Sequence, residues 1–173
     1  MEDRFLMEDL FEPLVHSLEE ELRVYGELVQ VVQDKQEVII AGDLDRLRHL
    51  VGEEQRLLAE AKAAEKHRKE AVRTIALARD LQEESPRLTD ILPASPEPYR
   101  THLQHLRQNI QSRLNRLFLV NQENELLINT SLNHIRGMVQ LFLNVNEDAP
   151  ALYTPQGTVD SKETANQMID CRI

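Results

Sequence analysis

Apolar residues recur every three or four positions over most of this chain, which is the spacing of amphipathic helices. The spacing predicts a helix over about residues 8–40 and a second helix over about residues 43–82. Between them, Gly42 is suited to end the first helix and the Asp43 carboxylate to cap the second. Pro13 is expected near the first turn of the first helix, where its missing N–H costs little. Because the connection is short, the second helix is expected to run back along the first.

A proline-rich segment and a third helix follow. The prolines between residues 83 and 98 predict a crossover loop over residues 83–95, with one local turn at "RLTDIL". A third helix is predicted over about residues 96–143, with Ser95 as its cap. At 1.5 Å per residue this helix would be about 70 Å long. We therefore predict an all-α fold over residues 1–144, an elongated antiparallel bundle of three long helices with coiled-coil-like packing.

The chain changes in character after this helix. Residues 145–173 contain two prolines, a glycine and little material for a core. This composition predicts a flexible C-terminal tail. Ala165, Met168 and Ile169 lie at helical spacing behind Ser161, a weak pattern typical of a segment that folds on binding.

Two amides interrupt the apolar seam of the third helix. The seam residues are Tyr99, Leu103, Leu106, Ile110, Leu114, Leu117, Asn121, Asn124, Ile128, Leu132, Ile135, Val139 and Phe142. A buried amide lowers stability but penalises incorrect registers, because an unpaired partner costs about 1 to 3 kcal/mol. Asn121 and Asn124 are therefore interpreted first as register determinants. The alternative is that the seam is open at this point, so that both amides face solvent or a visiting segment.

The end of the third helix is apolar over more than half of its circumference. The residues concerned are Leu126, Leu127, Ile128, Leu132, Ile135, Met138, Val139, Leu141, Phe142 and Leu143. They are too many for one narrow stripe. If the first two helices cover only part of them, an exposed groove remains of the kind that receives an amphipathic helix.

The net charge limits the classes of partner that we expect. The formal net charge is −10, from 30 acidic and 20 basic residues, which disfavours nucleic acid and anionic membranes. No stretch approaches 18 apolar residues, so membrane insertion is not expected. The first residues carry acids and a proline where a secretory signal needs a basic start and an apolar run. We expect a cytoplasmic protein.

The sequence offers no constellation typical of an enzyme. Phosphate-binding glycine loops, nucleophile elbows and zincin motifs are absent from it. His102 and His105 lie three residues apart on one helix, but two ligands make a poor metal site, so a solvated or partly packed pair is favoured. Cys171 is the only cysteine and has no internal disulfide partner. Arg100, Arg107, Arg113 and Arg116 are interpreted as interhelical partners of the acidic first helix. We expect no catalysis, metal or cofactor.

Three segments carry a family resemblance. They are "YGELVQVVQDKQEVIIAGDLDRLRHLVGEEQRLL", "VNQENELLINTSLNHI" and "LYTPQGTVDSKE". In this order they resemble the FlgN-like flagellar export chaperones, and the likeness spans nearly the whole chain. It rests on the joint order of the segments, because each is degenerate alone. The proline-rich loop matches no family feature, which leaves the geometry between the second and third helices open.

The resemblance implies a chaperone without ATPase activity. Such a protein binds the C-terminal helices of the hook-filament junction proteins (hook-associated proteins), keeps them unpolymerised and delivers them to the flagellar type III export gate. The family's tail tyrosine is associated with docking to that gate, and the matching position is Tyr153. The alternative for Tyr153 is an aromatic side chain that pins the tail onto the bundle. We assign client binding, as a hypothesis, to Leu132, Ile135, Val139, Phe142, Met168 and Ile169.

A structural role is the alternative to the chaperone hypothesis. A coiled-coil adaptor without a secreted client would have a self-complementary seam and form a stable dimer. A homo-oligomer is compatible with the sequence, and the mass of the protein in solution separates the two classes.

Overall fold

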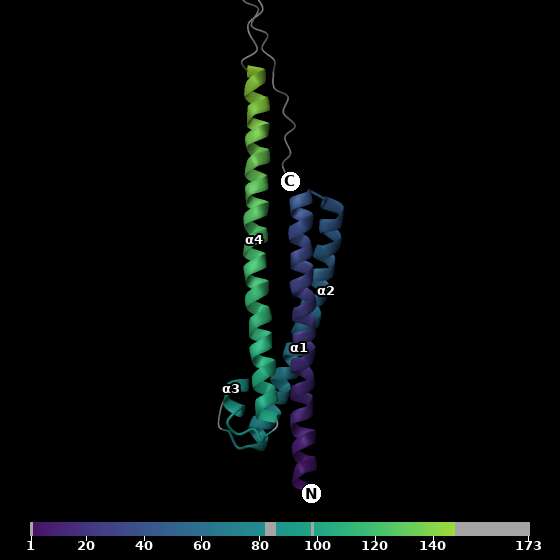
Figure 1. Ribbon diagram of the computed structural model, residues 1–173, viewed down its shortest axis with the longest axis vertical. Coiled ribbons are helices and arrows are strands. Elements are labelled where there is room, and N and C mark those ends of the chain that lie inside the picture. Colours follow the sequence, from purple (N-terminus) through teal and green to yellow (C-terminus); the bar gives the residue numbers. More distant parts are fainter. Residues whose placement is uncertain (1, 82–85, 98, 148–173) are drawn as a thin grey trace, which may run out of the picture. The chain divides into compact units, whose positions relative to one another are not determined.

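The computed structural model describes residues 2–81, 86–97 and 99–147, with side chains from Leu10 to Leu143 within these ranges (Figure 1). The described residues form four helices and no β-strand. The helices are α1 (Glu2–Ala41), α2 (Leu44–Ala78), α3 (Leu88–Ile91) and α4 (Tyr99–Glu147). The all-α class is confirmed. The count of three helices is corrected to four, because the turn at "RLTDIL" is a short helix.

The observed boundaries of the long helices differ from the predicted ones by a few residues. The largest difference is at α1, which begins at Glu2 and contains Pro13 in its interior. A proline inside a helix removes one hydrogen bond and costs about 3 kcal/mol. Phe11 and Leu14, on either side of it, are completely buried, whereas Pro13 itself is exposed. Burial of these neighbours offsets the lost bond and keeps the helix continuous.

The connection between α1 and α2 has the predicted chemistry. Gly42 adopts φ 70°, which lets the backbone N–H groups of Gly42 and Asp43 donate to the carbonyls of Ile39 and Val38. The Asp43 carboxylate accepts a hydrogen bond from the Arg46 N–H at 3.0 Å and so caps α2. The chain therefore reverses within two residues, and α2 packs along α1 (Figure 1).

The chain divides into two compact units, Met1–Thr130 and Ser131–Ile173, so the division falls within α4. The sequence instead places a boundary after residue 144. The first unit has two apolar clusters. The first cluster contains Phe11, Leu14, Leu18, Ala71, Val72, Ile75, Ala76, Leu88, Ile91, Leu92, Leu103, Leu106 and Ile110. The second cluster contains Val24, Leu28, Val31, Val38, Leu50, Leu57 and Ala61.

The clusters define the direction of α4 within the first unit. The start of α4 shares the first cluster with the start of α1 and the end of α2. The rings of Phe11 and Tyr99 stack there, with centroids 5.3 Å apart. Further along, Leu117 packs against the second cluster, which holds the end of α1 and the start of α2. In this unit α4 therefore runs parallel to α1 and antiparallel to α2.

A polar contact separates the two clusters. Glu21 of α1 is buried and accepts a hydrogen bond from the Arg68 guanidinium of α2 at 2.7 Å. A second cross-helix ion pair joins Lys35 to Glu54, also at 2.7 Å. Each pair has one member on each helix, so sliding α2 along α1 would separate both. These two contacts fix the register of α2 on α1, because the apolar contacts between the helices have little directionality.

The proline-rich segment is packed against the first cluster through α3. Leu88 and Ile91 of α3 are buried there. The Ser95 hydroxyl donates to the Ile91 carbonyl at 2.8 Å, so Ser95 closes α3 and is not the cap of α4. Arg100 donates to the carbonyls of Leu92, Pro93 and Ser95. The carbonyls that follow α3 thus have a cationic partner.

The predicted pairing of the α4 arginines with α1 carboxylates is therefore wrong for Arg100. Among the described side chains, the ion pair that joins α4 to α1 is His102 with Glu19, at 3.4 Å. Arg113 lies against Gly26 of α1, where a Cβ atom would be 3.6 Å from the guanidinium. The small residue leaves room for this side chain on the α1 surface.

The buried carboxylate predicts a pH effect on stability. Burial raises the pKa of Glu21 despite the hydrogen bond from Arg68. The folded chain therefore holds this proton to higher pH than the unfolded chain. The stabilising contribution is complete below the ordinary carboxyl pKa and is lost as pH rises through the raised pKa. From about pH 4 to about pH 7, the free energy of unfolding should fall less in the Glu21→Gln variant than in the parent chain. Urea unfolding at both pH values measures this difference.

Glu20→Gln is the matched control. The hydrogen bond from Arg23 lowers the pKa of Glu20, so this carboxylate contributes stability that is lost as pH falls. Its replacement should shift the pH dependence in the opposite direction, and only slightly, because Glu20 is largely solvated. Shifts of the same sign in both variants would contradict the assignment.

Candidate functional site

One face of α4 is buried against the rest of the first unit. Leu103, Leu106, Ile110, Val120 and Asn124 are buried. Leu117 and Leu127 are half-buried, and the positions are three or four residues apart except for Ile110 and Leu117, which are seven apart. We call these seven residues the buried seam. This spacing is that of a coiled-coil contact.

Asn124 is the polar member of the buried seam. Its side chain is 3% exposed, and its Nδ2 donates to the backbone carbonyl of Val32 in α1 at 2.8 Å. Its Oδ1 is also buried and has no hydrogen-bond partner among the described residues. A single donor thus ties α4 to one carbonyl of α1. A displaced register would leave the Nδ2 group of Asn124 buried and unpaired as well as its Oδ1, which is unfavourable.

Asn121 does not share this position. The buried seam passes through Val120 and Asn124, so Asn121 lies on its flank and is exposed. The prediction that both amides lie in one seam is wrong for Asn121. Leu114, expected in the same seam, is also exposed, to 39%. The two amides therefore have different environments and need different explanations.

A second stripe runs along α4 within the first unit. It consists of Leu114, Phe118, Asn121, Glu125 and Ile128, spaced alternately by four and three residues. All five are exposed, Phe118 to 61%. We call this set the exposed stripe. It has the spacing of a coiled-coil seam, but it is open to solvent.

The described α4 residues of the second unit present an apolar face of their own. Leu132, Ile135, Val139 and Phe142 are between 44% and 72% exposed. We call these four residues the apolar face. Met138, Leu141 and Leu143 are also exposed. Residues 131–143 contain no acidic residue, although the whole chain carries a net charge of −10.

Such exposure is typical of a binding surface. Single exposed leucines are ordinary, but contiguous apolar side chains on one helix mark sites for partners. The apolar face contains the four α4 residues to which the sequence hypothesis assigns client binding. The other hypothesised residues, Met168 and Ile169 for the client and Tyr153 for the gate, lie outside the described residues.

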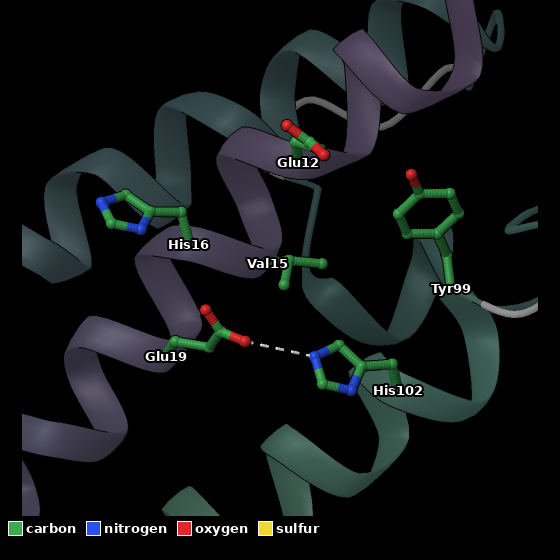
Figure 2. A pocket seen from close by; sticks show the side chains of 6 residues that line it. All are labelled: Glu12, Val15, His16, Glu19, Tyr99 and His102. Atoms are coloured by element: carbon green, nitrogen blue, oxygen red, sulfur yellow. Dashed lines mark ion pairs between the residues drawn. The ribbon is translucent and has the colours of Figure 1, made fainter. Parts of the chain in front are cut away.

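Two histidines line a pocket of the first unit. Figure 2 shows an open pocket between α1 and α4, lined by Glu12, Val15, His16, Glu19, Tyr99 and His102. Glu19 and His102 pair across it, His16 lies apart from this pair, and His105 is not part of the lining. Among the described residues no three potential ligands converge on one point. None of the helices, as far as they are described, is long and apolar enough to cross a membrane.

A helical chain with a buried seam, an exposed apolar face and no convergent polar centre in its described part has the features of a protein-binding protein. The family model described as FlgN protein matches residues 7–161. The chain therefore belongs to the FlgN family, a family of flagellar export chaperones. No curated protein and no solved structure matches the chain significantly.

Sequence reasoning missed the exposed stripe as a separate feature. It merged Leu114, Asn121 and Ile128 with the buried positions into one seam and did not assign Phe118 or Glu125. The signal was present, because two series with alternating spacings of three and four residues can be traced through residues 114–128. Only the position of α1 decides which series is buried.

The two amides are expected to differ in their contribution to stability. Asn124→Ala removes the hydrogen bond to Val32 and leaves a void, so the free energy of unfolding should fall by about 1–2 kcal/mol. Asn121→Ala changes an exposed side chain and should stay within about 0.5 kcal/mol. Urea unfolding followed by far-UV circular dichroism compares them. Equal losses would show that the amides share one environment after all.

Proposed function

We propose that this chain is a cytoplasmic export chaperone that binds the C-terminal helices of flagellar hook-filament junction proteins, prevents their premature assembly and delivers them to the export gate. Membership of the FlgN family supports the general role. The observation that carries the binding mode is the exposure of the apolar face, Leu132, Ile135, Val139 and Phe142.

The spacing of the apolar face suits a helical client. Its four residues lie at spacings of three, four and three, so they follow one side of α4. An amphipathic client helix has anchors with the same spacing and can pack along such a side. Covering the apolar side of the client removes the surface that would otherwise drive its self-assembly.

Moderate affinity follows from the size of the site. Full burial of each such side chain contributes about 1.5–3 kcal/mol. Association costs at least about 4 kcal/mol, with more for each segment that becomes ordered. A few apolar anchors therefore give a complex that holds its client but still dissociates. Such release needs no nucleotide hydrolysis, which agrees with a chaperone role without an enzymatic step.

The C-terminal segment has a separate role in this proposal. Met168 and Ile169 add apolar contacts when the client binds, at an ordering cost that keeps affinity moderate. Tyr153 docks to the export gate. Client capture and delivery are thus assigned to different residues.

A structural adaptor is the second candidate, and one observation favours it. Leu44, Val51 and Leu58 of α2 are exposed and lie seven residues apart, the repeat of a coiled-coil contact. A second copy of the chain pairing along this side of α2 would form a stable dimer. Light scattering separates the candidates, because the chaperone proposal expects a one-to-one complex with the client.

The client-binding assignment is tested by a double substitution. Ile135→Asp with Val139→Asp places two charges in the apolar face and should abolish capture of a hook-filament junction protein, because each carboxylate would have to be desolvated. Both residues are exposed, so helicity should be retained. Capture is measured by pull-down with the purified client and helicity by circular dichroism.

Asn129→Asp with Asn133→Asp is the matched control. It adds the same two charges at the same spacing on the same helix, at exposed polar positions. Capture should be preserved in this variant. Undiminished capture by the Ile135 and Val139 variant would remove the proposed site.

The role of Tyr153 is tested separately. Tyr153→Ala should leave client affinity unchanged and reduce export of the client, because the substitution removes a gate contact and no client contact. Client affinity is measured with purified proteins and export by secretion of the client from cells. A parallel loss of both would contradict the division between capture and delivery.

A further inference from the structure

The exposed stripe of the first unit is apolar at three positions and polar at two. Leu114, Phe118 and Ile128 are the apolar members, and Asn121 and Glu125 are consecutive members between them. The two polar side chains lie one turn apart on the same side of α4. The stripe therefore presents an amide and a carboxylate inside an apolar surface.

Glu125 has no cationic partner in the described part of the chain. No ion pair or side-chain hydrogen bond joins it to a described residue, whereas neighbouring Glu123 accepts a hydrogen bond from Gln36 of α1. The α4 residues three and four positions away from Glu125 are Asn121, Gln122, Ile128 and Asn129, none of which is basic. The carboxylate is left to solvent and to any partner that covers the stripe.

A helix packed on this stripe would remove water from Glu125. An apolar side chain opposite the carboxylate leaves its charge desolvated and unpaired, which is strongly unfavourable. An acidic side chain adds repulsion. A lysine or arginine supplies both the opposite charge and hydrogen-bond donors, and the Asn121 amide oxygen offers a further acceptor.

We propose that Asn121 and Glu125 select guest helices that carry a lysine or arginine within an otherwise apolar seam. The inference rests on the proposed function, since it takes an amphipathic helix as the guest, and it adds a rule for which helix is accepted. A second copy of this chain fits poorly, because its own stripe carries the same carboxylate and its net charge is −10. The polar pair thus acts by rejecting guests whose seams are wholly apolar or acidic.

Three synthetic helical peptides test the rule. Each has about 28 residues, four heptads, with leucine and isoleucine in its seam. They differ only at one central seam position, which is lysine, leucine or glutamate. Binding to the full chain is measured by fluorescence anisotropy. The affinity of the lysine peptide should be at least about tenfold higher than that of the glutamate peptide, with the leucine peptide between them.

Charge reversal provides the decisive comparison. Glu125→Lys should invert the order, so that the glutamate peptide binds more tightly than the lysine peptide. Glu123→Lys makes the same change of net charge two residues away and should leave the order unchanged. Equal binding of all three peptides, or an unchanged order in Glu125→Lys, would overturn the selection rule.

The outcomes also separate this rule from the proposed function. If all three peptides bind equally while the Ile135→Asp and Val139→Asp variant fails to capture the client, the client site stands and the rule falls. If the lysine preference is found but that variant captures the client undiminished, the rule stands and the assignment of the apolar face falls. If no peptide binds the parent chain, the rule falls, and the proposed function falls only if the chain also fails to capture the client.

Discussion

The burial of α1 is the constraint on which the rest of the first unit depends. This helix supplies Phe11, Leu14 and Leu18 to one apolar cluster and Val24, Leu28 and Val31 to the other. Its apolar side chains cannot be covered by α2 alone, so α4 completes the cover. Apolar contact drives this assembly but tolerates sliding, because it is non-directional. The specificity comes from a few polar contacts, Glu21 with Arg68 for α2 and Asn124 with the Val32 carbonyl for α4.

This arrangement uses only one side of α4. The buried seam meets α1, while the exposed stripe stays uncovered although it has the same heptad spacing. The two closely spaced amides therefore serve different contacts. Asn124 fixes the packing of the chain on itself, and Asn121 lies on the exposed stripe, the surface that we propose for a guest helix. Their separation by only three residues follows from two seams running along one helix.

The sequence was sufficient to predict the long helices and their order, because the signals are local: periodicity, Gly42, Asp43 and the proline-rich segment. It was insufficient where the outcome depends on a distant partner. Pro13 is a local helix breaker, yet the burial of Phe11 and Leu14 keeps α1 intact. Ser95 has the residue type of an N-cap, but the nearby Ile91 carbonyl takes its hydroxyl. Likewise, spacing alone could not separate Val120 from Asn121, since only the position of α1 determines which of them is buried. The exposed apolar end of α4 could be predicted from its excess of apolar residues. Glu125 could not be singled out, because exposed acidic residues are common.

A purely apolar binding surface would suit an export chaperone poorly. Such a surface binds any amphipathic helix, and its affinity rises with every methylene group that it buries. The polar pair Asn121 and Glu125 lowers the affinity of the exposed stripe for every guest, since even the correct guest must desolvate a charge. The correct guest recovers most of this loss through a charge-assisted hydrogen bond, whereas incorrect guests recover none. Discrimination therefore rises while absolute affinity stays low enough for release, which are the two properties that delivery of a client requires together.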